Sequence, residues 1–128
     1  MLKYQLTLTE KQAQIVQDAC ELYERLHAGQ WFALEPCLKF REDCYFWMVE
    51  DNFKRFVEPY LDLREMRFER NAGDIYHVIR HRISWDRCPE GGKTVNFHEP
   101  MKFGEEPLPE IKRVEEENEK RGFYLLNH

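Results

Sequence analysis

A stretch of helical apolar spacing between Thr9 and Gly29 limits the folds open to this chain more than any other feature of the sequence. Thr9 stands three residues before Gln12, which is the spacing of a capping box, and Gly29 is a typical residue to end a helix. The sequence therefore predicts a helix over residues 10–28. Its apolar residues recur three and four positions apart, with Cys20 beside them as a small buried hydrophobe: Ala13, Ile15, Val16, Ala19, Leu22, Tyr23 and Leu26.

The residues before this helix follow a period of two. Tyr4, Leu6 and Leu8 share one side of an extended chain, and polar residues alternate with them. This alternation predicts a half-buried strand over residues 3–8. A second short alternating segment predicts another strand over residues 94–98.

An aromatic-rich region follows the first helix. Trp31 and Phe32 are expected to pack on that helix, within a short helix that ends near Pro36. Over residues 42–58 apolar spacings of three, four and seven favour a helix, but the run YFWMV leaves a strand open. Pro59 ends either structure.

A second main helix is predicted over residues 74–88, and the breakers in residues 89–92 end it. Three prolines and a glycine then favour an extended course. We therefore expect one α+β domain, in which short antiparallel strands pack on two main helices. Residues 1–98 form its core and residues 99–128 an extended acidic C-terminal arm.

The length of 128 residues and the mass of 15.7 kDa fit a single domain. No apolar run approaches the roughly 18 residues that span a bilayer, and the first residues lack the apolar segment of a secretory signal. We therefore expect a cytoplasmic protein with four free thiols. A core of this size cannot hide all the aromatic side chains, so we expect a homo-oligomer; the residues concerned are Trp31, Phe32, Phe46 and Trp47.

The formal charge of −5 argues against generic binding of nucleic acid or of an anionic membrane, since such binding needs a broad cationic field. Acidic residues gather in residues 99–120, whereas residues 64–87 carry six arginines. Arginine suits bidentate binding of phosphate or carboxylate, or pairing between subunits.

No motif in the sequence argues for catalysis or for a bound cofactor. Residues 91–94 (GGKT) resemble the end of a phosphate-binding loop but lack its earlier glycine and its preceding strand. His77 and His81 lie four residues apart and both could reach one metal ion, although the glutamate of a zincin is missing after His77. A third ligand would have to be His98 or Cys88. We expect neither an enzyme nor a metal site.

The densest functional signal lies in the second main helix, over residues 76–87. Its arginines could clamp phosphates, and the aromatic rings at its flanks could stack on a base. The alternative is an amphipathic core helix whose arginines pair with Asp74, Asp86 and the acidic arm. The candidate ligand-binding residues on this helix are Tyr76, Arg80, His81, Trp85 and Arg87.

The sequence resembles a group of small tailed-phage proteins. The resemblance covers about two thirds of the chain in the same order, apart from the middle over residues 40–70. If the chain is phage-encoded, its compartment is the host cytoplasm. The motifs that carry the resemblance are LTLTEKQA (6–13), DACELY (18–23), GQW (29–31), DIYHVIRHR (74–82), WDR (85–87), PEG (89–91) and NFHEP (96–100).

These phage proteins are similar, in length and in their opening residues, to the Thoeris anti-defence sponges. Sponges are oligomeric phage proteins that sequester cyclic ADP-ribose-type immune signals and, in some members, cyclic oligonucleotides. The resemblance implies a protein that binds a cyclic nucleotide messenger without catalysis, using arginines for phosphates, an aromatic ring for the base and an amide for the ribose. The residues that supply these groups are Arg80, Arg82, Trp85, Tyr76 and Asn96.

The alternative function is a phage accessory factor that binds a host or phage protein. A nucleotide binder should hold at least two arginines of residues 80–87 in a concave pocket without carboxylate partners, whereas an accessory protein should show them in ion pairs or on a flat surface. Arg80 and Arg82 diverge by about 200° around a helix. We therefore expect Arg80 to serve recognition and Arg82 to be a structural cation paired with a carboxylate, for which a subunit interface is one location.

Overall fold

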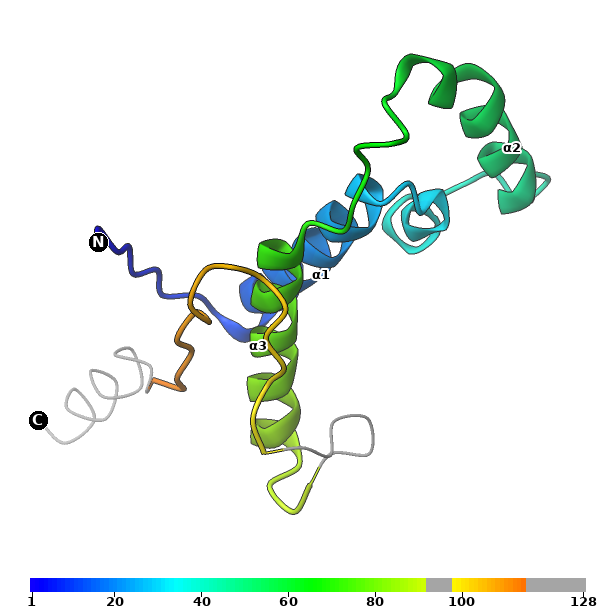
Figure 1. Ribbon diagram of the computed structural model, residues 1–128. Coiled ribbons are helices and arrows are strands. Elements are labelled where there is room, and N and C mark those ends of the chain that lie inside the picture. The colour runs from blue at the N-terminus through cyan, green and yellow to red at the C-terminus, as the bar shows by residue number, and fades with distance from the viewer. Residues whose placement is uncertain (92–97, 115–128) are drawn as a thin grey trace, which may run out of the picture.

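The computed structural model describes residues 1–91 and 98–114, and its regular structure is helical (Figure 1). No strand occurs in this described part, so the expected α+β fold with strands packed on two main helices is wrong. The α-helices are α1 (Glu10–His27), α2 (Phe46–Phe56) and α3 (Arg70–Arg87), and the 3₁₀ helices are η1 (Trp31–Cys37) and η2 (Glu58–Tyr60).

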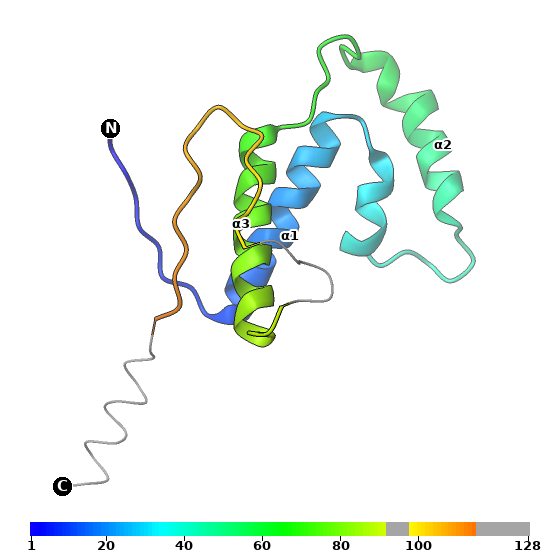
Figure 2. The same cartoon turned by 60° about the horizontal axis from the view of Figure 1, so that its bottom comes forward.

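The helices form two groups. α1 and α3 lie side by side and make the most extensive contact between elements (Figures 1 and 2). α2 packs on η1 and η2 and has no close contact with α1 or α3. We call η1, α2 and η2 the lateral limb, which Figure 2 shows beside the α1–α3 pair. The chain passes between the groups over residues 28–30 and again over residues 61–69.

The N-terminal segment, for which the sequence predicted a strand over residues 3–8, is extended but unpaired. Tyr4 is 93% exposed and Leu6 is 76% exposed, and no described segment forms a ladder with them. An alternating pattern makes a stable strand only where neighbouring strands supply hydrogen bonds and an apolar face. Of the second predicted strand, residues 94–97 lie outside the described residues, and His98 is in a bend.

The predicted capping box of α1 is confirmed. The Thr9 hydroxyl accepts the Gln12 backbone N–H at 3.2 Å, and the Gln12 side chain accepts the Thr9 backbone N–H at 3.0 Å. Gly29 follows the helix with a φ of 76°, and the N–H of Gln30 donates to the carbonyl of Arg25 at 3.0 Å. A positive φ is easy for glycine, so the chain turns sharply here toward the lateral limb.

α1 does not bury the apolar stripe that the sequence singles out. Ile15 and Tyr23 belong to that stripe and are 59% and 54% exposed, and Ala19 is exposed as well. Glu24, on another side of the helix, is only 8% exposed and lies against Gly73 of α3. Because Gly73 has no side chain, the two helices can approach closely along the face that carries Glu24.

The lateral limb settles the alternatives that the sequence left open. Residues 42–58 contain the helix α2 rather than a strand, and η1 runs through Pro36 instead of ending at it. Trp31 is 6% exposed, stacks on Phe53 at 5.3 Å and donates from Nε1 to Glu58 at 2.7 Å. Phe32 lies near α1, where the Arg25 guanidinium is 5.8 Å from its ring. The two aromatic neighbours therefore join different groups of helices.

α3 begins at Arg70, four residues before the predicted start, because Glu69 caps it. The Glu69 carboxylate accepts the Ala72 backbone N–H at 3.3 Å, which satisfies a donor that the first turn leaves free. Val78 and Ile79 are buried at 4% and 7% exposure and form the core of the α1–α3 pair. The helix ends next to Cys88, where the sequence predicted its end.

The core of the protein is shallow. In the described residues no side chain is less than 2% exposed. All four cysteines are free thiols, as predicted. A domain with so little buried apolar surface leaves apolar side chains available for other molecules. The buried apolar residues are Trp31, Ala33, Ala72, Val78 and Ile79.

Candidate functional site

α3 carries five of the six predicted ligand-binding residues, and the structure divides them among three places. Asn96, the sixth, lies outside the described residues. Tyr76 and Arg80 form one pair, His81 and Trp85 form a second pair, and Arg87 stands apart at the end of the helix.

Two of the three arginines in residues 80–87 are in ion pairs. Arg87 donates from Nε to the Glu10 carboxylate of α1 at 2.9 Å. Arg82 Nη2 lies 2.6 Å from the carboxylate of Asp86, one turn later in α3. The prediction that Arg82 is paired with a carboxylate is confirmed, with the partner on its own helix. A phosphate would have to compete with these carboxylates.

Arg80 has no carboxylate partner among the described residues. Its Nη1 donates to the phenol oxygen of Tyr76 at 3.4 Å. Burial, helped by the negative charge of Glu21, raises the pKa of Tyr76. Burial and then the positive charge of Arg80 lower the pKa of His77 below its usual 6.5. At neutral pH Arg80 is therefore a single cation beside a neutral phenol and a neutral imidazole.

Trp85 is already stacked by another part of the chain. The ring of His98 lies 5.4 Å from the indole at an interplanar angle of 24°, and the ring of His81 lies 6.1 Å away. A base would have to displace His98 in order to stack on that side of Trp85. The structure thus brings the predicted residues Trp85 and His81 together, but the ring of His98 occupies one face of the indole.

The described residues contain no group of three histidine, cysteine, aspartate or glutamate side chains placed to hold a metal ion. His77 instead lies beside Phe103, with ring centroids 6.2 Å apart. The histidine pair therefore gains no third ligand in this part of the protein.

A contact between α3 and the C-terminal arm was missed by the sequence analysis. Asp74 is only 2% exposed, and its two carboxylate oxygens accept the backbone N–H groups of Phe103 at 2.8 Å and of Gly104 at 2.9 Å. The Asn71 side chain accepts the N–H of Glu106 at 3.2 Å. We call these residues the arm clasp. The one available signal was an aspartate on the apolar stripe of a helix, where an unpaired charge is costly.

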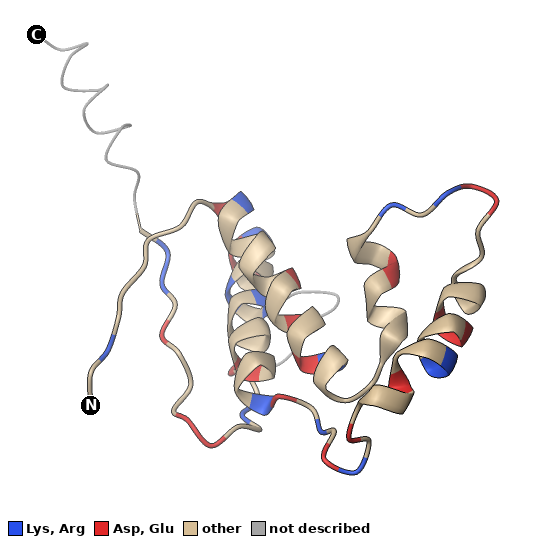
Figure 3. Cartoon of the chain, turned by 90° about the horizontal axis from the view of Figure 1, so that it is seen from above, with Lys and Arg blue, Asp and Glu red and all other residues tan. Residues whose placement is uncertain are grey.

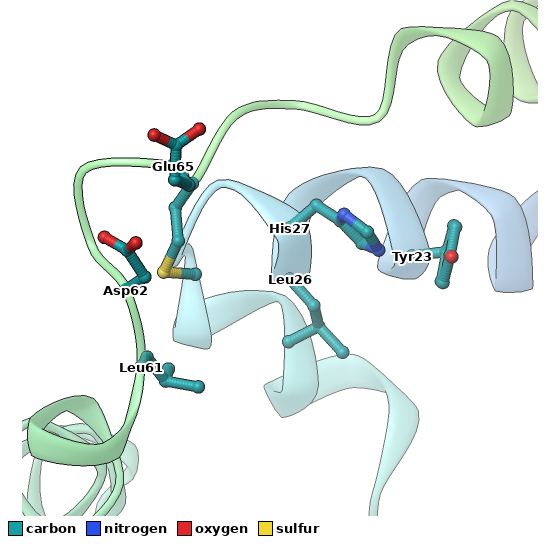
Figure 4. Close-up of a pocket in the computed structure, with 7 residues that line it drawn as sticks. Tyr23, Leu26, His27, Leu61, Asp62 and Glu65 are labelled. Atoms are coloured by element: carbon teal, nitrogen blue, oxygen red, sulfur yellow. The ribbon is translucent and has the colours of Figure 1, made fainter.

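A shallow hollow of about 430 Å³ lies at the C-terminal end of α1 (Figure 4). Tyr23, Leu26 and His27 line it from α1, and the passage over residues 61–66 lines it from the other side. Its walls are mainly apolar, and Figure 4 shows Glu65 pointing away from α1. None of the predicted ligand-binding residues lines this hollow, which sequence spacing could not reveal because its walls are far apart in the chain.

The helix α2 and the residue before it carry several exposed apolar side chains. Figure 3 shows acidic and basic residues interspersed along α2, and they pair within the helix, as Glu50 with Lys54 at 3.5 Å and Asp51 with Arg55 at 3.2 Å. We call the exposed apolar residues on and beside α2 the limb face, although Trp47 lies on the opposite side of the helix from Phe56: Tyr45 (67% exposed), Trp47 (68%), Met48 (41%) and Phe56 (68%).

Comparison with known proteins found no matching family model, no matching curated protein and no matching solved structure. Within residues 1–91 and 98–114, none of the helices is both long enough and apolar enough to cross a membrane.

Proposed function

We propose that the protein is a non-catalytic accessory factor that binds a partner protein through the limb face, within the cytoplasm. The observation that carries the proposal is the exposure of Phe56, which is 68% exposed, together with Met48, which is 41% exposed on the same side of α2. Large aromatic residues are enriched among the residues that dominate protein–protein binding energies. The resemblance to small tailed-phage proteins is in keeping with a factor that acts on a host or phage protein.

The arrangement of α2 fits an apolar groove on the partner. Met48, Asn52 and Phe56 follow one another at intervals of four residues, so they lie along one side of the helix. This is the spacing with which an amphipathic helix inserts anchors into a groove. The charges of α2 are satisfied by pairs within the helix, so the limb face carries little net charge toward the partner.

The arginines of α3 support this function over nucleotide sequestration. Arg82 and Arg87 are tied to carboxylates, which is the arrangement expected of an accessory protein. Arg80 is the observation that favours the second candidate, a binder of cyclic nucleotide messengers, because it has no carboxylate partner among the described residues. Arg80 alone offers one guanidinium group for bidentate binding, whereas the ligand carries two phosphates.

The test compares the wild-type protein with a Met48→Ala/Phe56→Ala variant in capture from a bacterial lysate. The captured protein is then purified and its dissociation constant measured by calorimetry. Tyr4→Ala is the matched control, since it removes an exposed aromatic ring far from α2. We expect the double variant to bind at least tenfold more weakly and the control to bind as the wild type does.

Two results would overturn the proposal. The first is equal binding of the captured protein by wild type and the double variant. The second comes from incubating the protein with cyclic dinucleotides and cyclic ADP-ribose isomers: depletion of free ligand that heat denaturation reverses, and that Arg80→Ala abolishes, would establish the second candidate instead.

A further inference from the structure

We propose that a second copy of this chain docks on the side of α1 opposite α3, so that two α1 helices pair in antiparallel orientation. We call this side the α1 seam: Ile15, Ala19, Leu22 and Leu26. The proposal concerns self-association and uses a surface other than the limb face.

The α1 seam has the spacing of a coiled-coil core. Its members are four, three and four residues apart, which is the alternation that keeps a stripe facing a partner helix. The seam lies opposite the side that packs on α3, where Glu24 is only 8% exposed. Ile15 is 59% exposed and Ala19 is exposed, although both stand at core positions of the pattern. The folded chain thus leaves the first half of the α1 seam uncovered, whereas Leu22 and Leu26 are half-buried, with Leu26 beside Leu61 and Met66.

The charges beside the seam identify the partner as another copy and set its direction. Asp18 and Arg25 are seven residues apart, so they flank the seam on the same side with opposite charges. In an antiparallel pair Asp18 faces Arg25 of the partner subunit and Arg25 faces Asp18 of the partner subunit, so both contacts are favourable. In a parallel pair the position facing Asp18 is Tyr23 of the partner subunit, which leaves the carboxylate without a cation.

Arg25 can make this contact without giving up its present ones. It donates from Nε to Glu21 at 3.2 Å and from Nη1 to Gln30 at 2.9 Å, and its guanidinium lies 5.8 Å from the ring of Phe32. A guanidinium carries five N–H donors, so further donors can face a second carboxylate. These hydrogen bonds already restrain the Arg25 side chain, so less conformational entropy is lost when the second copy binds.

The hollow at the end of α1 can receive a side chain of the partner subunit at each end of the antiparallel pair. In this register Ala19 packs against Leu22 of the partner subunit, and Leu26 packs against Ile15 of the partner subunit. Leu26 is part of the wall of the hollow, together with Leu61 and Met66 of the passage to α3 (Figure 4). The isoleucine of the partner subunit would therefore enter an apolar recess instead of facing water.

The experiment measures the molar mass of the full chain by sedimentation equilibrium across concentrations. We expect a dimer for the wild type, and at least a tenfold higher dissociation constant for Ile15→Asp. Leu38→Asp is the matched control, because Leu38 is a similarly exposed apolar residue at 56% exposure beside η1. Circular dichroism checks that the helices remain.

Charge exchange then tests the direction of pairing. The Asp18→Lys chain alone and the Arg25→Glu chain alone should both associate weakly, because each places like charges together in an antiparallel pair. A mixture of the two chains should regain the wild-type dissociation constant, because each contact then joins a cation to a carboxylate. A wild-type monomer at tens of micromolar, or a mixture no tighter than its parts, would overturn the proposal. Loss of the dimer in the Met48→Ala/Phe56→Ala variant would also do so and would place self-association on the limb face.

Discussion

The carboxylate of Glu24 occupies the space that a β-carbon on Gly73 would need, with Oε2 only 1.7 Å from that position. The end of the Glu24 side chain of α1 therefore fills the space that a side chain at position 73 of α3 would take. This relationship places an acid, only 8% exposed, in the interior of the pair of helices.

Gly73→Ala should change the stability of the protein little, because the helix preference of alanine, about 1 kcal/mol, is offset by the cost of moving the end of the Glu24 side chain. In a Glu24→Ala background the same substitution meets no carboxylate and should stabilise the protein by up to about 1 kcal/mol. Urea denaturation of the four proteins gives the coupling energy. Equal effects of Gly73→Ala in the two backgrounds would show that the crowding is relieved elsewhere.

The buried acid also predicts a dependence of stability on pH. Burial is the main cause that raises the pKa of Glu24 above 4.5, outweighing the nearby positive charges of Arg70 and Arg25. The folded state therefore binds the proton more tightly than the unfolded state, so stability is lost as the pH rises from about 4.5 through the raised pKa. Glu24→Gln should remove this loss and be more stable than the wild type at neutral pH. Unfolding curves measured from pH 4 to pH 8 check the sign.

His77 should act in the opposite direction. Its pKa is lowered below 6.5 by burial and by Arg80, so the unfolded state binds the proton more readily than the folded state does. Stability is present above pH 6.5 and is lost as the pH falls through the lowered pKa. His77→Gln should flatten this loss of stability at acid pH, whereas His27→Gln, at an exposed position of α1, serves as the control. An unchanged loss of stability at acid pH in His77→Gln would assign it to other groups.

Gly104→Ala should release the arm from α3. A β-carbon on Gly104 would lie 2.3 Å from the Asn71 side-chain oxygen and 3.0 Å from the Asn71 backbone nitrogen, and the backbone atom cannot move aside. Hydrogen exchange of the Phe103 amide should then speed up at least tenfold, because Asp74 no longer accepts its hydrogen bond. Met101→Ala, an exposed position on the same arm, should leave that rate unchanged.

The two neighbouring arginines of α3 should differ in their contribution to stability. Arg82→Ala removes a partly exposed pair with Asp86 and should lower the free energy of unfolding by about 0.5 kcal/mol. Arg80→Ala removes one long hydrogen bond to Tyr76 and should leave the melting temperature nearly unchanged. Calorimetry measures the melting temperatures of both variants. A larger loss of stability in Arg80→Ala than in Arg82→Ala would contradict the roles assigned to the two arginines.

Local signals in the sequence predicted much of the helical structure. The capping pair Thr9 and Gln12 gave the start of α1, and apolar spacing favoured α2, because both depend on residues within a few positions of each other. The sequence predicted the start of α3 at residue 74, after Gly73, whereas in the structure Gly73 lies inside α3 and leaves room for Glu24 of α1. Such a role depends on a residue far away in the chain.

The errors share a physical origin. The alternation around Tyr4 and Leu6 predicted a strand, but pairing needs a second strand that the described chain does not supply. The apolar stripe of α1 predicted a buried face, yet α3 packs on another side of that helix. Of the candidate site, the pairing of Arg82 was predictable because Asp86 is one turn away, whereas the partner of Arg87 is 77 residues distant.

The arm clasp constrains some positions of the sequence much more strongly than others. Asp74 holds the main-chain amides of Phe103 and Gly104, and amides are present whatever side chains the arm carries. Related chains should therefore retain the aspartate on α3 and the glycine at position 104, while the side chains of the other arm residues drift freely. An alignment of future homologues would then show an apparently variable tail anchored by two invariant positions 30 residues apart.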